Sequence, residues 1–242
     1  MRFGFFTVCI VFLSSCAPIY VPNVRNTPLF NGRGEFQGSA FIGTGIDLQG
    51  ALALSDHIGV IGNYSFLNET RNDPFDLNQK FKRKNNFFEG GVGYYKASRT
   101  GRVELYVGYG QGKSTTTGQY GFLGLGQQEV IVTGKYNRIF IQPSIGTNYG
   151  GFNLAFTPRF SLVNFKEFQS GAIVETPEEG AHLFIEPAAT ARFRLGGNLN
   201  GMFQLGLNMP MPNDAFFDYV PIQASIGIQL HLGESFRARV NK

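Results

Sequence analysis

Cysteine and histidine are scarce in this chain of 242 residues, which contains two cysteines, three histidines and no tryptophan. Cys9 lies in an N-terminal segment that we expect to be removed, so Cys16 is left without a partner and no disulfide can form. Because no free thiol remains and imidazoles are few, we expect neither a metal site built from nitrogen and sulfur ligands nor a bound cofactor.

Charge is sparse as well, since charged residues make up 16% of the chain and the formal net charge is +4. This positive surplus is too small to indicate binding to nucleic acid. Glycine, with 32 residues, and phenylalanine, with 25, are by contrast abundant, and they favour tight turns and aromatic-rich strands over helices. No break in composition marks a boundary after the N-terminal region, so a single folded domain is expected.

The N-terminus begins with a basic residue, Arg2, and an apolar run over residues 3–13. This run is too short for a membrane-spanning helix but has the length of the apolar part of a secretory signal peptide. It ends in Leu-Ser-Ser-Cys at residues 13–16, which resembles the lipobox of bacterial lipoproteins. The resemblance implies that residues 1–15 are a lipoprotein signal peptide and that Cys16 is acylated, whereas the alternative is an ordinary signal peptide with an incidental cysteine.

Residues 16–34 are expected to form a proline-rich tether between the lipid and the folded body, because Pro18, Pro22 and Pro28 favour an extended, irregular chain. In lipoproteins that are carried to the cell surface, an acidic run after the cysteine often serves as the export signal. No such run follows Cys16, which implies an anchor in the inner leaflet, on the periplasmic side.

Alternation of apolar and polar residues dominates the rest of the chain. From Ile222 to Leu232 every second residue is aliphatic and those between are polar or small, as in a two-faced β-strand. Counting such stretches between turn signals predicts about ten strands. They are expected at residues 35–43, 46–54, 58–67, 86–98, 103–115, 130–149, 152–167, 182–196, 200–210 and 219–232.

The connections alternate between short turns, such as residues 150–151, and longer segments, such as residues 68–85 and 116–129. This alternation is typical of outer-membrane barrels, in which an even strand count places both ends on the short-turn, periplasmic side. We therefore predict an all-β fold, a single up-and-down antiparallel transmembrane β-barrel of about ten strands, roughly 8 to 12. It is expected to cover residues 35–233 and to be followed by a C-terminal tail at residues 234–242.

Four prolines fall inside the predicted strands, where a residue without an N–H group is expected to mark a bulge or a strand end. They are Pro143, Pro158, Pro187 and Pro221. The short turns also predict which residues lie opposite each other in the hairpins. They place Ile145 opposite Phe156, Ile141 opposite Phe160, Gly91 opposite Gly110, Tyr95 opposite Tyr106, Arg192 opposite Gln204 and Arg194 opposite Met202.

The acylation motif, the proline-rich lead over residues 16–23 and the amphipathic strands together resemble the small outer-membrane β-barrel lipoproteins of Gram-negative bacteria. The resemblance covers nearly the whole chain and rests on architecture. It implies a fold and a location, and it transfers no functional residue.

Eight charged residues fall on the polar faces of the strands, which should point inward. They are Glu35, Asp47, Glu89, Glu104, Arg159, Glu186, Arg192 and Arg194. Side chains already fill a barrel of eight strands, so about ten strands leave a narrow lumen at most. Opposite charges should pair there and close the lumen, with a carboxylate contacting at least one of Arg192 and Arg194. The alternative is a path for small solutes lined by the same groups.

The long connections hold the best catalytic candidates, since His182 lies near Glu178 and Glu179 and the next long connection carries Asp214 and Asp218. An imidazole and a carboxylate could meet there, as in a surface-rim hydrolase or lipid-modifying enzyme, although a solvated acidic cluster is the simpler interpretation. Residues 80–84, Lys-Phe-Lys-Arg-Lys, form a basic run that would face either lipopolysaccharide phosphates or solvent.

The sequence thus favours a non-enzymatic outer-membrane barrel lipoprotein with a structural or accessory role in the cell envelope. A narrow channel for small solutes and a surface-rim enzyme remain as alternatives. The partners expected are outer-membrane lipid, lipopolysaccharide and a larger outer-membrane assembly, and no nucleic acid.

Overall fold

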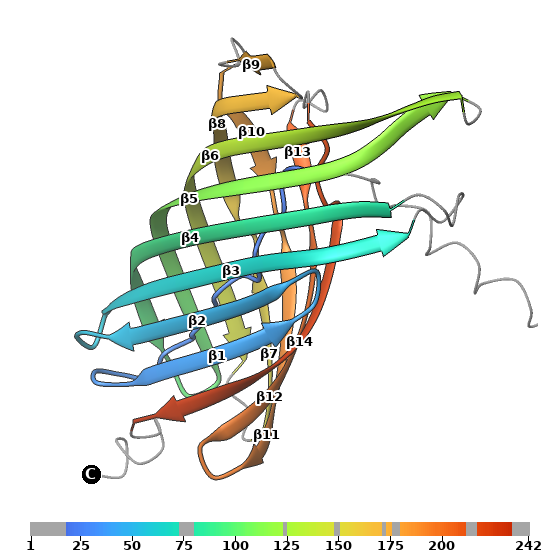
Figure 1. The fold of residues 1–242 in the computed structure, drawn as a ribbon. Coiled ribbons are helices and arrows are strands. Elements are labelled where there is room, and N and C mark those ends of the chain that lie inside the picture. The colour runs from blue at the N-terminus through green and yellow to red at the C-terminus, as the bar shows by residue number, and fades with distance from the viewer. Residues whose placement is uncertain are drawn as a thin grey trace, which may run out of the picture.

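A computed structural model of the chain describes residues 18–72, 80–122, 125–147, 151–170, 173–175, 180–211 and 217–233. Its strands close into a ten-stranded antiparallel barrel in which each strand pairs with its neighbours in the chain (Figure 1). Among these residues there is no helix long and apolar enough to cross a membrane. The predicted all-β, up-and-down barrel is therefore confirmed, whereas the predicted signal peptide and C-terminal tail lie outside the described residues.

The first six barrel strands are continuous, and they are β1 (Phe36–Ile42), β2 (Ile46–Ala53), β3 (Ile58–Asn72), β4 (Lys80–Ala97), β5 (Gly101–Phe122) and β6 (Leu125–Thr147). The next three are each interrupted once, and they are β7 (Phe152–Thr157) with β8 (Phe160–Ser170), β10 (His182–Ile185) with β11 (Ala188–Gly196), and β12 (Leu199–Leu207) with β13 (Met209–Met211). The tenth, β14 (Ile222–Leu232), closes the barrel against β1, and the short β9 (Ile173–Glu175) pairs antiparallel with the end of β8.

Strands β3 to β6 run further than the alternation of apolar residues predicts. Most of the expected loops at residues 68–85 and 116–129 continue the ladder, for example where Glu69 pairs with Arg83 and Thr116 with Val132. These extensions are mostly polar on both faces, so they lack the apolar period of two by which a strand is recognised. Their backbone hydrogen bonds nevertheless continue the sheet.

The two faces of the sheet differ as the alternation predicts. Val92, Val107 and Ile141 lie side by side on β4, β5 and β6 and are 49%, 49% and 43% exposed on the outer surface. Glu89 and Gln142, on the same strands, point inward and are buried. An outer surface of contiguous aliphatic side chains is costly in water and suits the hydrocarbon band of a membrane.

Three of the four prolines expected to mark bulges or strand ends lie outside the strands of the structure. Pro158 and Pro187 fall in the interruptions between β7 and β8 and between β10 and β11, and Pro221 precedes β14. These three match the predicted strand ends. Pro143 keeps its place in β6 opposite Leu105, so the bulge expected there is absent, but it lies where the pairing of β6 changes from β7 to β8.

The registers match the prediction in one hairpin and differ in two. Ile145 pairs with Phe156 and Ile141 with Phe160, as expected. Gly91 pairs with Gly108 and Tyr95 with Glu104, because a hydrogen bond from the N–H of Ser98 to the carbonyl of Gly101 at 2.8 Å centres the turn on residues 99–100, one residue earlier than predicted. Arg192 pairs with Met202 and Arg194 with Asn200, because the strand bulges between Arg194 and Gly196. Each error is two residues, so every side chain keeps its face.

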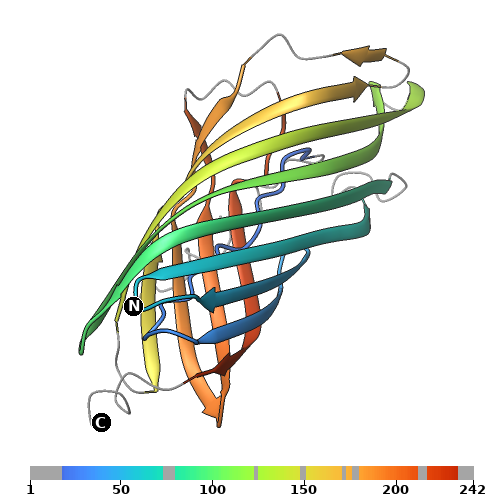
Figure 2. The same ribbon diagram turned by 90° about the vertical axis from the view of Figure 1, so that its left-hand side faces the viewer.

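The segment before β1 corrects the predicted tether. Residues 18–30 are all buried and Asn31 is half-buried, since this part of the chain lies inside the barrel rather than outside it (Figure 2). We call residues 18–31 the lumenal segment. It is irregular and extended, as its prolines predict, but its backbone N–H and C=O groups then need partners, and inward side chains of the barrel supply them.

Candidate functional site

The candidate site comprises the lumenal segment and the inward side chains that bind it. The segment begins at the barrel end with the long connections, where Ile19 and Tyr20 donate their N–H groups to the carbonyl of Asp218 at 2.9 and 3.1 Å. Val220 donates to the carbonyl of Tyr20 at 3.1 Å, and Tyr20 forms a parallel bridge with Tyr219. The start of the segment is thus fixed to the chain between β13 and β14.

Aromatic side chains surround Tyr20 in this half of the barrel. Its ring centroid lies 5.5 Å from that of Tyr136 and 4.8 Å from that of Phe184. The hydroxyl of Tyr20 donates to Oε1 of Glu186 at 2.6 Å and accepts from Nη1 of Arg138 at 3.0 Å. Tyr20 therefore connects an apolar cluster to the ionic network at the centre of the lumen.

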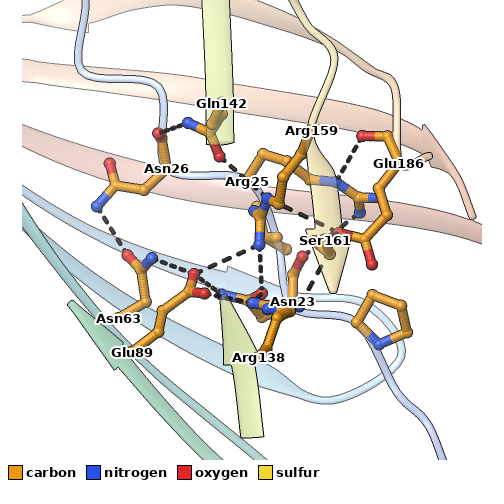
Figure 3. Close-up of polar contacts among 12 residues, drawn as sticks. Asn23, Arg25, Asn26, Asn63, Glu89, Arg138, Gln142, Arg159, Ser161 and Glu186 are labelled. Carbon is orange, nitrogen blue, oxygen red and sulfur yellow. Dashed lines mark hydrogen bonds and ion pairs between the residues drawn. The ribbon is translucent and has the colours of Figure 1, made fainter. Parts of the chain in front are cut away.

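Asn23 occupies the middle of that network (Figure 3). Its amide nitrogen donates to Oε1 of Glu89 at 2.7 Å, and its amide oxygen accepts from Arg138 at 2.6 Å and from Arg159 at 3.0 Å. Glu89 also forms ion pairs with Arg138 and, at 3.4 Å, with Arg159. Glu186 lies 3.9 Å from Arg138 and 3.8 Å from Arg159. Because all of these groups are buried, each charge depends on these contacts.

Arg25 adds a third buried guanidinium, and it comes from the lumenal segment itself. It donates to the side-chain oxygens of Asn208 and, at 2.7 Å, of Gln223. It also donates to the backbone carbonyls of Leu207 at 3.1 Å and Glu186 at 3.3 Å. Charged donors with several good acceptors are among the stronger hydrogen-bonded groups in proteins.

Pro187 explains why the backbone carbonyl of Leu207 is available to Arg25. Leu207 donates its N–H to the carbonyl of Pro187 at 2.9 Å, but proline has no N–H to return the bond across the ladder. The carbonyl of Leu207 accepts from Arg25 instead. An interruption in the barrel wall thus supplies an acceptor for the lumenal segment.

Inward glutamines bind the backbone of the segment. Gln204 both accepts from the N–H of Arg25 at 2.8 Å and donates to its carbonyl at 2.9 Å, as a neighbouring strand would. Four further glutamine side chains donate to backbone carbonyls, namely Gln223 to Pro22 at 3.0 Å, Gln49 to Val24 at 2.7 Å, Gln142 to Asn26 at 2.8 Å and Gln37 to Pro28 at 2.9 Å. The barrel wall is therefore built to hold an extended peptide.

The second half of the segment leads to the short-turn end. The hydroxyls of Thr27 and Thr157 lie 2.9 Å apart, and the N–H of Phe30 donates to Glu104 at 3.1 Å. The ring of Phe30 packs against that of Tyr95, with centroids 5.2 Å apart. The segment therefore contacts inward side chains along its full length.

Glu35 fastens the exit of the segment to the last strand. Its carboxylate accepts from the N–H of Asn31 at 2.7 Å and from the Gln37 amide at 2.6 Å, and it lies 3.0 Å from Nε2 of His231. Burial alone would raise the pKa of Glu35, but the contact with His231 and the hydrogen bonds from Asn31 and Gln37 outweigh it and hold that pKa below its usual range.

The structure brings most of the predicted lumen charges together. Buried in the interior are Glu35, Asp47, Glu89, Glu104, Arg159, Glu186 and Arg192. Arg194 is exposed at the short-turn end, where it donates to the carbonyl of Gly197 at 3.3 Å. Arg192 donates to the carbonyls of Thr27 and Pro28, at 2.9 and 3.3 Å, so neutral acceptors of the lumenal segment take the place of the expected carboxylate contact.

Three central residues were not among those predicted for the lumen, namely Asn23, Arg25 and Arg138. Arg138 shares the inward parity of Gln142 on β6, so this position was accessible to sequence reasoning. Asn23 and Arg25 lie outside the strands, where no period applies. The composition of the segment could have indicated its burial, since a flexible tether rarely contains so many apolar and aromatic residues as residues 19–30 do.

Of the rim candidates, the structure describes His182 and Asp218. The ring of His182 packs edge-on against Phe217, with centroids 5.1 Å apart, and Asp218 offers its carbonyl to the lumenal segment. The other predicted members, Glu178, Glu179 and Asp214, lie outside the described residues. The described part of the chain contains no cluster of three or more side chains able to hold a metal ion.

The basic run at residues 80–84 belongs to β4 rather than to a loop, and within it Arg83 points inward to an ion pair with Glu69. A second basic group lies on the outer surface, where Lys113, Lys135 and Lys166 line a hollow of about 440 Å³. Lys113 and Lys135 are direct neighbours across β5 and β6. Like charges in this position repel each other, and Glu167, 2.8 Å from Lys135, offsets part of the charge.

No protein-family model matches the chain, and no curated protein sequence matches it. Among solved structures it is similar to the outer membrane protease OmpT from Escherichia coli, with a TM-score of 0.51 and 11% identity over 83% of this chain and 94% of that one. The translocator domain of the autotransporter NalP from Neisseria meningitidis gives a TM-score of 0.43 with 11% identity, covering 83% of this chain and 86% of that one. The KdgM porin gives 0.38 with 9% identity, covering 82% and 99%. At such identities the likeness to OmpT concerns the fold alone.

Proposed function

We propose that the protein is a non-enzymatic outer-membrane lipoprotein whose barrel is sealed by its own lumenal segment and serves a structural or accessory role in the envelope. The observation that carries this proposal is the burial of residues 18–30 inside the barrel, bound there by side chains of most strands. A binding groove for a mobile solute would need free polar groups, whereas here Asn23 and Arg25 occupy them.

The aliphatic outer surface supports a position in the outer membrane, and the lipobox-like motif before Cys16 supports an acyl anchor. Metabolic labelling with a palmitate analogue tests the anchor. The wild-type protein should incorporate the label and the Cys16→Ser variant should not. Equal labelling of the two proteins would contradict acylation at Cys16.

Electrical conductance distinguishes the sealed barrel from a narrow channel. Moving the lumenal segment aside would leave Glu89, Arg138 and Arg159 without Asn23 in a dry interior, which is costly for buried charges. We therefore expect the purified protein to give no stable conductance steps in a planar bilayer in which a porin control conducts. Steady, ion-selective conductance steps would contradict the sealed barrel and support the narrow channel.

The lysine-lined hollow is the proposed contact with lipopolysaccharide. Phosphate groups of this lipid would relieve the repulsion between Lys113 and Lys135, while the outward rings of Tyr64 and Phe88, which also line the hollow, face its acyl chains. The double variant Lys113→Gln with Lys166→Gln should retain less lipopolysaccharide per barrel after purification. Lys96→Gln, on the outer surface near the short-turn end, is the matched control. Equal retention by all three proteins would contradict this contact.

A further inference from the structure

The lumenal segment has a direction as well as a position. Pro18 accepts at 3.4 Å from the hydroxyl of Thr116, which lies in the protruding part of β5 at the long-connection end of the barrel. Phe30 lies at the other end, close to Gly59 at the start of β3. The chain therefore enters the lumen at the long-connection end and leaves it at the short-turn end, as the blue segment in Figure 2 shows.

The length of the segment suits a complete crossing. An extended chain covers about 3.3 Å per residue, so residues 18–31 can reach roughly 45 Å. The apolar band of an outer-membrane barrel is about 25 Å tall. The segment thus spans the barrel with enough length to follow an irregular path.

The chain reverses direction at the short-turn end. Gly34 has a φ of 79°, in the region that favours glycine, and its N–H donates to the carbonyl of Ala53 at 2.8 Å. Glu35 donates to the carbonyl of Gly32 at 3.4 Å, and β1 begins at Phe36. The first strand then returns toward the long-connection end.

Building on the sealed barrel proposed above, we infer that the acylated Cys16 is held at the long-connection end and that its acyl chains anchor in the outer leaflet. Cys16 lies two residues before Pro18, so its Cα is within about 7 Å of the Cα of Pro18. The long connections of outer-membrane barrels face the cell exterior. The anchor therefore belongs on the cell surface, opposite to the periplasmic side that the missing acidic run implies.

This arrangement gives the barrel a second role, as the passage that carries its own lipidated N-terminus across the membrane. The ionic network around Asn23 leaves no room to pull a lipid through a finished barrel, so the strands must close around the segment. Export of the anchor then accompanies folding of the barrel, and no separate acidic signal is needed.

A protease site of seven residues inserted between Ala17 and Pro18 tests this inference in intact cells. We expect added tobacco etch virus protease to cleave it without permeabilisation of the outer membrane. The same site inserted between Gly150 and Gly151, in a short turn, should be cleaved only after permeabilisation. Protection of the first site in intact cells, with cleavage in detergent, would overturn the inference.

A single substitution gives the same information if the insertion prevents folding. Ala17→Cys introduces a free thiol, since Cys16 is acylated and Cys9 is removed in the mature chain. A membrane-impermeant maleimide should label Ala17→Cys in intact cells, whereas Ser98→Cys, in an exposed short turn, should react only after permeabilisation. The reverse pattern would place the N-terminus in the periplasm.

A disulfide separates failure of this inference from failure of the sealed barrel. The adjacent hydroxyls of Thr27 and Thr157 predict that Thr27→Cys and Thr157→Cys form a bond when combined. If this bond forms but Ala17→Cys reacts with the maleimide only after permeabilisation, the sealed barrel is supported and the surface anchor is contradicted. If the bond does not form and the protein conducts, the sealed barrel itself falls.

Discussion

Asn23 shows how a single side chain can hold the lumenal segment in place. Its amide serves a carboxylate and two guanidinium groups at once, all of them buried. Asn23→Ala leaves these groups short of partners, and an unsatisfied buried polar group costs about 1–3 kcal/mol, with more for charged groups. We expect the free energy of unfolding, measured by urea titration in lipid vesicles, to fall by at least that amount. Gln111→Ala, on the outer surface, should leave it nearly unchanged, and equal losses would contradict the network.

Glu35 gives the barrel a predicted dependence on pH. Its pKa is lower in the folded state, so the folded state favours the carboxylate. Its contribution to stability is then complete above the unfolded pKa of about 4.3 and is lost as pH falls through the lower folded pKa. The wild-type protein should lose stability on acidification over this window, and Glu35→Gln should lose less, as measured by urea unfolding at each pH. If the unfolding free energies of the two proteins fell equally with pH, Glu35 would not be the cause of the pH dependence.

The alternation of polar and apolar residues predicts the inward charges but not their partners. The inward parity of Arg159 and Glu186 follows from alternation, whereas the contact of each with the N-terminal segment does not. Arg192 illustrates the limit, because a search for a carboxylate partner overlooks the backbone carbonyls of a segment assigned elsewhere.

The strands themselves were predictable because burial on one face imposes a period of two. Where both faces are polar, as in the extensions of β3 to β6, the period disappears although the ladder continues. Registers depended on turn geometry, and the hairpin at Ser98 to Gly101 shows that hydrogen bonds of one serine can move a register by two residues without changing any face. The lumenal segment was not predictable from periodicity, since its order comes from the finished barrel.

The outer surface of β5 offers a matched test of the membrane band. Val107 lies among aliphatic neighbours and Gln111 lies four residues along the same face, at the polar margin. An arginine at the middle of the band costs about 2–4 kcal/mol and one near the interface about 0–1 kcal/mol. Val107→Arg should therefore lower the unfolding free energy in vesicles far more than Gln111→Arg does. Equal effects would mean that this surface does not face lipid.

At the scale of the whole molecule, the barrel and the lumenal segment form one folding unit. The wall contributes Glu89, Arg138, Arg159 and Glu186, and the segment contributes the groups that complete their hydrogen bonds. Without the other part, each would have buried polar groups that lack hydrogen-bond partners, since buried charges need partners and an extended backbone needs acceptors and donors. The proline interruptions fit this view, because they leave wall carbonyls available for Arg25.

Hydrogen exchange of the native protein, read by mass spectrometry, tests the central claim most directly. Backbone N–H groups of Ile19, Tyr20, Arg25 and Phe30 donate to the barrel, so peptides covering residues 18–31 should exchange as slowly as those from β14. The exposed turn at Ser98 to Gly101 provides the fast reference within the same sample. Exchange of residues 18–31 as rapid as that of an unfolded peptide would contradict a lumen filled by the N-terminal segment.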